Sequence, residues 1–182
     1  MPLASPFAFL GPFHPQIVHT PIALLIFSAF FAIVGRLFDR DWLRKSSALL
    51  LVIGFVGAYA AEQSGVPAHR VPEHEQGVPE RDIDAHGDSG HWVVWLAGGA
   101  VIALAISSRL QGNAANVVAV LALLLQLGAA VMVGVAGYRG GKLVYEHAAN
   151  VHVDGRLVKS ADAGKHPEGE GESEREPGGD RR

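Results

Sequence analysis

The stretch IVHTPIALLIFSAFFAIVGRL, residues 17–37, decides the fold of this chain. It carries a single charged side chain, Arg36, close to its end. A helix needs about 20 mostly apolar residues to cross roughly 30 Å of hydrocarbon. Residues 17–37 are therefore predicted to form a membrane-spanning helix.

Three further stretches have the same apolar character. They cover residues 43–61, 92–108 and 116–138. Long charge-poor segments that alternate with charged ones are typical of a polytopic membrane protein. We therefore expect an all-α fold, with a four-helix transmembrane bundle in residues 1–153 and a long outer loop at residues 62–91. Residues 154–182 are rich in Gly, Glu, Lys and Arg and cannot bury enough apolar surface, so they are predicted to form a disordered polar tail.

The charges of the connections predict the orientation of the bundle. Basic residues crowd the first connection and mark the third: Arg36, Arg40, Arg44, Lys45 and Arg109. Such short basic loops are retained in the cytoplasm, whereas residues 62–91 are mainly acidic. The N- and C-termini are therefore expected on the outer, periplasmic side of a bacterial inner membrane. Arg139 and Lys142, just after the fourth apolar stretch, oppose this assignment.

The composition excludes several classes of function. The formal net charge is only −3, so the chain lacks the basic surface that binding to nucleic acid requires. There is no cysteine, which excludes disulfides, thiolate zinc sites and iron–sulfur ligation by this chain. Any metal must be held by His, Asp, Glu or Met side chains.

Small residues predict where the helices touch, because close backbone approach drives helix association in lipid. The predicted contact residues are Gly54, Gly57 and Ala58 in the second helix, and Gln126, Gly134 and Gly137 in the fourth. Gln126 lies near the predicted bilayer midplane, so its amide is expected to form an interhelical hydrogen bond.

The histidines are distributed unevenly. The nine are His14, His19, His69, His74, His86, His91, His147, His152 and His166. None belongs to the predicted inner side of the membrane. Because imidazole ligates metals and haem and titrates near neutral pH, this asymmetry predicts a site at the outer surface.

The first histidine cluster surrounds the start of the first helix. Two starts are open: Pro15 as the first helical residue with a kink near Pro21, or Thr20 as N-cap with Pro21 as the first helical residue. Both place His19 at the outer lip of the bundle, close to His14.

Two further clusters lie at the same predicted depth. His86 and His91 end the outer loop, whereas Glu146 and His147 follow the fourth helix. The candidate cofactor ligands are His19, His86, His91 and His147. The candidate metal ligands or their hydrogen-bond partners are His14, His19, His86, His147 and Glu146. The alternative is that each imidazole is simply solvated or hydrogen-bonded, which is favoured for the other four histidines, His69, His74, His152 and His166.

Two motifs carry a resemblance to a known family. FHPQIVHTPI, residues 13–22, resembles the His-Pro-x-x-Val-His-aromatic-Pro-Ile opening of bacterial membrane proteins grouped as domain of unknown function 2231. GGKLVYEH, residues 140–147, is similar to the closing motif of that family. Thr20 replaces the usual aromatic residue, which bears on packing beside His19. Ala148 replaces the usual Gly, which bears on the turn after His147.

The resemblance implies a redox context, although the family has no settled activity. Its relatives are sometimes joined to c-type cytochrome or Rieske modules, which implies electron transfer at the outer face and cytochrome or iron–sulfur proteins as partners. Position by position, it singles out His14, His19 and His147, with His86 as the outer-loop histidine.

Two hypotheses follow. In the first, the chain is a redox-associated module that binds haem b, or a copper or zinc ion, through outer-face histidines inside a four-helix bundle. In the second, it is a non-catalytic accessory or structural subunit of a respiratory, photosynthetic or secretory membrane complex. Neither makes the chain an enzyme. A transport pathway is disfavoured because Gln126 is the only strongly polar residue expected at mid-depth.

Overall fold

The computed structural model describes residues 8–68 and 76–158, which form helices and one short hairpin. The elements are the 3-10 helix η1 (Ala8–Phe13), α1 (His14–Ile17), α2 (His19–Leu37), α3 (Asp41–Ala68), α4 (Glu80–Ser107), α5 (Gly112–His147), β1 (His152–Val153) and β2 (Arg156–Leu157). Four helical segments are long and apolar enough to cross a membrane, namely Phe9–Leu37, Asp41–Ala68, Glu80–Ser107 and Gly112–His147. The chain is therefore a membrane-spanning bundle of four helices, as predicted.

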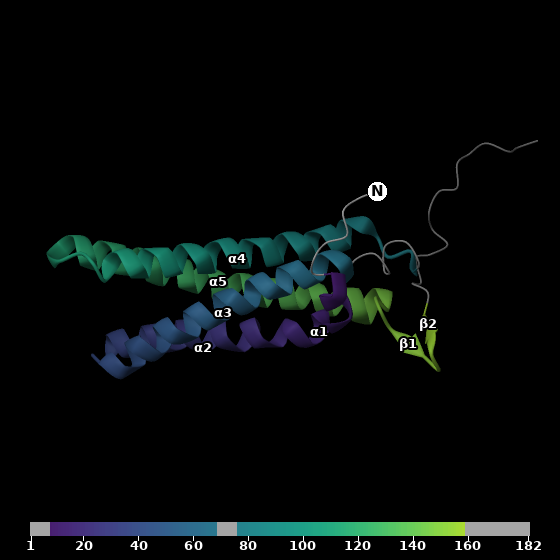
Figure 1. Cartoon of the computed structure of the whole chain (residues 1–182), viewed down its shortest axis with the longest axis horizontal. Helices are drawn as coiled ribbons and strands as arrows, with labels where there is room; N and C mark the ends of the chain where they lie inside the picture. The colour runs from purple at the N-terminus through teal and green to yellow at the C-terminus, as the bar shows by residue number, and fades with distance from the viewer. Residues whose placement is uncertain (1–7, 69–75, 159–182) are drawn as a thin grey trace, which may run out of the picture.

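Two antiparallel helical hairpins, α2–α3 and α4–α5, make up the bundle (Figure 1). They lie against each other at the end that carries η1, α1 and the β hairpin, and they separate toward the opposite end (Figure 1). We call the first the histidine end, because it contains His14, His86 and His147. The other is the arginine end, because Arg40 and Arg109 lie in its connections.

The helices extend further at the histidine end than the apolar stretches predict. α3 ends at Ala68, and α4 begins at Glu80. Most of the predicted outer loop, residues 62–91, is therefore helical, and that prediction is wrong. Hydropathy detects the part of a helix that lies in lipid, whereas these polar turns are stabilised by contacts with one another.

The lengths show how far the bundle projects from the membrane. α5 has 36 residues, which correspond to about 54 Å of helix. The hydrocarbon core is only about 30 Å thick. The polar ends of α3, α4 and α5 thus continue the bundle beyond the lipid.

Exposed aromatic residues mark the two interfaces. Tyr59, Trp92 and Trp95 are exposed toward the histidine end, and Trp42 is exposed at the start of α3. Trp42 and Tyr59 are separated by about 25 Å along α3, close to the thickness of the hydrocarbon. Amphipathic rings favour the headgroup level, so the histidine end begins where the lipid ends.

The first helix has an irregular start. α1 begins at His14 with Pro15 at its start, and α2 begins at His19. Val18 between them keeps helical angles, with φ of −63° and ψ of −25°, and its N–H donates to the His14 carbonyl at 3.1 Å. The first alternative, with Pro15 near the helix start and a kink near Pro21, is therefore closer to the structure. Pro21 has no N–H to donate to the Ile17 carbonyl four residues earlier, which accounts for the irregularity.

Small side chains fill the core between the hairpins. The buried apolar cluster comprises Leu25, Leu51, Ala58, Val93, Ala97, Ala100, Ala129 and Val133. A Cβ atom at Gly54 would lie 2.8 Å from Leu25 Cδ2, and one at Gly57 would lie 3.4 Å from Pro21 Cδ. These two glycines therefore allow α2 and α3 to approach closely.

The contact face of α5 differs from the prediction. Gly134 and Gly137 are exposed, and a Cβ atom at either would meet nothing within 4 Å. The structure therefore corrects the prediction that these two glycines pack inside the bundle. The buried stripe of α5 instead contains Ala122, Gln126, Ala129 and Val133.

Gln126 forms the predicted interhelical hydrogen bonds. Its Nε2 donates to Ser28 Oγ of α2 and to Ser47 Oγ of α3, the latter at 3.0 Å. The two serine hydroxyls also cross between helices, each donating to the other residue's carbonyl at 2.9 Å. One buried polar cluster thus joins three of the four spanning helices.

Part of the predicted tail is ordered. His152 pairs with Leu157 and Val153 with Arg156 in an antiparallel hairpin. Asp154 and Gly155 form its turn with positive φ angles of 50° and 72°, as two-residue hairpin turns require. Residues 154–158 are therefore not disordered, and the remainder of the predicted tail lies outside the described residues.

Candidate functional site

Two imidazoles from separate helices meet at the histidine end. His14 of α1 and His86 of α4 lie with their ring centroids 6.3 Å apart and their planes 83° apart, an edge-to-face contact. Both side chains are half-buried. This contact is the centre of the candidate site.

Ser64 of α3 fixes the protonation of His14. The Ser64 hydroxyl lies 2.8 Å from His14 Nδ1 and donates its own proton to the Ala61 carbonyl, also at 2.8 Å. Nδ1 must therefore be the donor in the contact with Ser64. The lone pair of the neutral His14 ring is consequently on Nε2.

A backbone carbonyl determines which nitrogen of His86 carries the proton. Its Nδ1 lies 3.1 Å from the Ala136 carbonyl of α5. A carbonyl only accepts, so Nδ1 carries the proton and Nε2 carries the lone pair of the neutral ring. The two imidazoles thus have the same tautomer.

Glycines make room for both rings. A Cβ atom at Gly65 would lie 3.3 Å from His14 Cε1, and one at Gly140 would lie 3.0 Å from His86 Cε1. Gly140 opens the GGKLVYEH motif, so its role in this structure is to let the His86 ring lie against α5. Any larger residue at these positions would displace the imidazoles.

His91 belongs to a different, exposed group. Its Nδ1 donates to Glu62 Oε1 at 2.6 Å, and its Nε2 accepts from Trp95 Nε1 at 2.7 Å. Both ring nitrogens are therefore engaged by protein side chains, and the structure does not bring His91 to the pair formed by His14 and His86.

His147 is buried in a third group with Asp82. His147 Nε2 lies 3.1 Å from Asp82 Oδ2, and Lys142 Nζ lies 3.8 Å from the same oxygen. Glu146 pairs with Lys142 at 3.6 Å instead of contacting an imidazole. Sequence reasoning missed Asp82, because it placed the residue in a loop.

The other histidines lie apart from the pair or outside the described residues. His19 is exposed, and its Nδ1 donates to the Pro15 carbonyl at 2.5 Å. His152 lies in β1, with Nδ1 3.2 Å from the Asn150 carbonyl. His69, His74 and His166 fall outside the described residues. Within the part of the chain that the structure describes, no three His, Asp or Glu side chains form a group that could hold a metal ion.

Arg139 secures the helix pair beside His86. Its Nη1 donates to the Ala85 carbonyl at 2.7 Å and to Ser89 Oγ at 2.6 Å. Ser89 is buried and donates in turn to the Ala85 carbonyl at 2.8 Å. These bonds fix the register of α5 against α4 one turn from His86. The sequence alone indicates only that the positive charge of Arg139 opposes the predicted orientation of the bundle.

Gln76 links the segment that precedes α4 to the residues that follow α5. Its Nε2 donates to the carbonyls of Ala148 at 2.8 Å and Val158 at 2.5 Å. Its Oε1 accepts from the Asn150 amide at 2.7 Å. Gln76 is 1% exposed, and no sequence pattern singled it out. It attaches the hairpin to the segment that precedes α4.

Comparison with known proteins agrees with this architecture. A family model described as a predicted membrane protein, DUF2231, matches residues 11–154. No curated protein and no solved structure matches the chain. The matched region contains all four spanning helices and both motifs that surround the two-histidine contact. The chain therefore belongs to the domain of unknown function 2231 family of predicted membrane proteins.

Proposed function

We propose that the protein is a membrane-anchored, redox-associated module that binds a cofactor through His14 and His86. The observation that carries the proposal is the contact between these two rings, each of which gives its Nδ1 proton to an oxygen. Metal-ligating histidines almost always donate the other ring N–H to such an acceptor, which orients the ring and makes the ligating nitrogen more basic. Ser64 and the Ala136 carbonyl are the orienting groups.

The spacing of the rings supports ligation of one metal centre by both. With metal–nitrogen distances of about 2.0–2.1 Å, two imidazoles on opposite sides of a metal have centroids on the order of 6 Å apart. The observed separation is 6.3 Å. The separation of the two centroids therefore supports the proposal that both rings act as ligands.

Haem b fits this ligand set better than a bare copper or zinc ion. A structural zinc site takes four protein ligands and a catalytic one takes three. Among the described residues, no three His, Asp or Glu side chains lie close enough together to hold a metal ion. His14 and His86 would be the two protein ligands of a haem iron, whose remaining ligands come from the porphyrin itself. When bound, haem would supply one-electron transfer at the bundle's projecting end.

The proposal places the histidine end on the periplasmic side of a bacterial inner membrane. The distribution of basic residues supports this orientation. The arginine end carries Arg36, Arg40, Arg44, Lys45 and Arg109 around its two short connections. Short basic loops favour the cytoplasm. A periplasmic cytochrome or iron–sulfur protein is then the chemical class of partner that could exchange electrons with the site.

Absorbance spectroscopy and metal analysis of the full-length protein in detergent test the proposal. The expected result is a Soret band with close to one haem per chain, which His14→Ala and His86→Ala each abolish. The matched controls are His19→Ala and His152→Ala, which remove exposed histidines whose Nδ1 atoms also bond backbone carbonyls. Absence of haem, copper and zinc from the wild type, together with failure of added haem to bind, would refute the proposal.

One observation favours the second candidate, an accessory subunit of a larger membrane complex. Gly134 and Gly137 lie exposed on α5 with open space above them, which is where a helix of another subunit can approach closely. Purification in mild detergent tests this candidate. Gly134→Leu should release a co-purifying membrane protein, whereas a wild-type protein that purifies alone contradicts it.

A further inference from the structure

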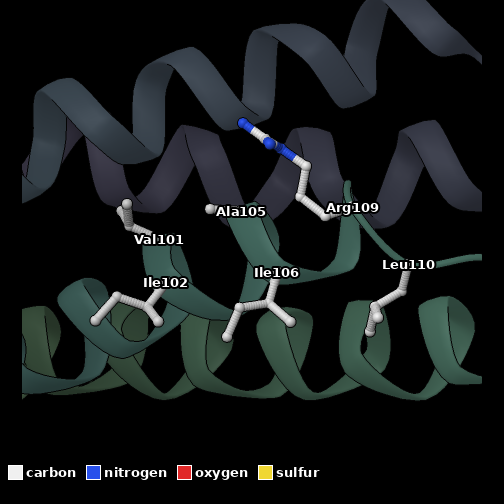
Figure 2. Close-up of a pocket in the computed structure, with 6 residues that line it drawn as sticks. All are labelled: Val101, Ile102, Ala105, Ile106, Arg109 and Leu110. Carbon is white, nitrogen blue, oxygen red and sulfur yellow. The ribbon is translucent and has the colours of Figure 1, made fainter.

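An apolar groove runs along α4 at the arginine end, far from the histidines. Its lining residues are Val101, Ile102, Ala105, Ile106, Arg109 and Leu110. The groove has a volume of about 470 Å³. In Figure 2 the apolar side chains line one stretch of α4 and its end, and the Arg109 side chain reaches across toward the neighbouring helix. The groove is therefore almost wholly apolar, and the Arg109 guanidinium lies beside it.

Arg109 differs from Arg36 and Arg44, which lie at the same end of the bundle. Arg44 is paired with Asp39 at 2.8 Å and with Asp41 at 2.5 Å. Arg36 donates to the carbonyls of Ala32 and Ala119. Arg109 is exposed and forms no side-chain hydrogen bond or ion pair with the residues that the structure describes. Its guanidinium is thus available to an anion from outside the chain.

We propose that this groove binds an anionic glycerophospholipid, with an acyl chain along the apolar wall and the phosphate on Arg109. The apolar wall suits an acyl chain, and the exposed guanidinium beside it suits the phosphate. The planar guanidinium can donate two parallel hydrogen bonds to a phosphate. Within a bilayer, an acyl chain is the occupant that an apolar wall favours over water.

The position of the groove also suits a lipid. From Val101 to Leu110 it extends for about 14 Å along the chain, if helical rise is kept, which is a large part of one leaflet. Arg109 lies beyond the last residue of α4, Ser107. A basic residue near an anionic membrane surface contributes about 1 kcal/mol, or about fivefold in affinity.

Native mass spectrometry of the full-length protein, released from nanodiscs that contain equal amounts of phosphatidylglycerol and phosphatidylcholine, tests the proposal. The wild type should retain phosphatidylglycerol preferentially. Arg109→Gln should reduce this retention about fivefold, and Arg109→Lys should restore most of it. Arg40→Gln is the matched control, because Arg40 is an exposed arginine at the same end but outside the groove. It should leave the retention unchanged.

A second variant tests the apolar half of the site. Ala105→Phe fills the groove without changing any charge, and it should lower the retention of phosphatidylglycerol at least as much as Arg109→Gln does. Equal retention of the two lipids by the wild type, or equal losses for Arg109→Gln and Arg40→Gln, would overturn the proposal. Because the groove and the histidine pair lie at opposite ends of the bundle, this outcome is independent of haem binding.

Discussion

The imidazole ring of His14 contacts that of His86 edge to face, although the first precedes the long helix α2 and the second lies in α4. Each ring is oriented by a further helix, His14 by Ser64 of α3 and His86 by the Ala136 carbonyl of α5. Four helical elements therefore determine the geometry of one pair of nitrogens. The contact is a property of the assembled bundle and of no single segment.

Removal of the hydroxyl that orients His14 should weaken cofactor binding without removing a ligand. In Ser64→Ala the Nδ1 proton of His14 loses its acceptor, and loss of such an orienting partner typically costs 10- to 100-fold in affinity. Haem titration followed by absorbance measures this. Ser108→Ala is the control, since Ser108 bonds the Ala105 carbonyl at the other end of α4. Equal affinities for the two variants would show that Ser64 has no orienting role.

Gln126→Leu should lower the free energy of unfolding in mixed micelles by about 1 kcal/mol. The variant removes two interhelical hydrogen bonds, and in membrane proteins each contributes on average about 0.6 kcal/mol. Gln16→Leu changes an exposed glutamine in the same way and should have no effect. An unchanged or increased free energy of unfolding for Gln126→Leu would show that these hydrogen bonds do not stabilise the bundle.

Two glycines should respond differently to the same substitution. Gly54→Ala places a Cβ atom 2.8 Å from Leu25 Cδ2, and overpacking of this kind costs about 1–3 kcal/mol. Gly134→Ala meets no atom within 4 Å and should be neutral. Unfolding of both variants under one set of conditions gives the comparison. Similar losses at both sites would contradict the assignment of Gly54 to the contact between α2 and α3.

Ala148→Gly should stabilise the protein by about 1 kcal/mol. Ala148 caps α5 in the left-handed region, with φ of 53°, which costs a residue with a Cβ atom about 1–2 kcal/mol. Ala149→Gly is the control, because Ala149 has no positive φ and packs against the small cluster of Val78, Ile83 and Leu143. It should lower stability. A destabilised Ala148→Gly variant would mean that the Cβ atom makes a compensating contact.

The sidedness of the bundle can be measured directly because the chain has no cysteine. Asp84→Cys introduces a thiol on the exposed face of α4 at the histidine end, and Arg40→Cys introduces one in the connection between α2 and α3. A membrane-impermeant maleimide should label the first but not the second in intact cells. The reverse pattern would place the histidine pair in the cytoplasm.

The sequence predicts the four spanning helices correctly because lipid imposes one simple requirement, a long apolar helix. The same reasoning fails beyond the lipid. Glu80, Asp82 and Asp88 are read as loop residues, yet they belong to α4 because its polar turns pack on α5. Once α4 is known to begin at Glu80, the four-residue spacing of Asp82 and His86 places both on one helix face.

The candidate site is predicted only in part. His14 and His86 are both among the candidate ligands, but their pairing depends on how α1 lies against α3 and α4, which spacing does not reveal. The small-residue rule selects Gly134 and Gly137 of α5, whereas the neighbouring stripe with Ala129 and Val133 is buried. One signal was overlooked: the Asp-Gly dipeptide at 154–155 is typical of a hairpin turn.

The start of the first helix links the histidine pair to two spanning helices. η1 and α1 lie against the end of α3, where Gly11 approaches Pro67 and His14 is bonded to Ser64. Val18 keeps helical angles, and its N–H donates to the His14 carbonyl at 3.1 Å, so α1 continues into α2. The position of the His14 imidazole therefore depends on α2 as well as on α3, and a change in the tilt of α2 would alter its distance from His86.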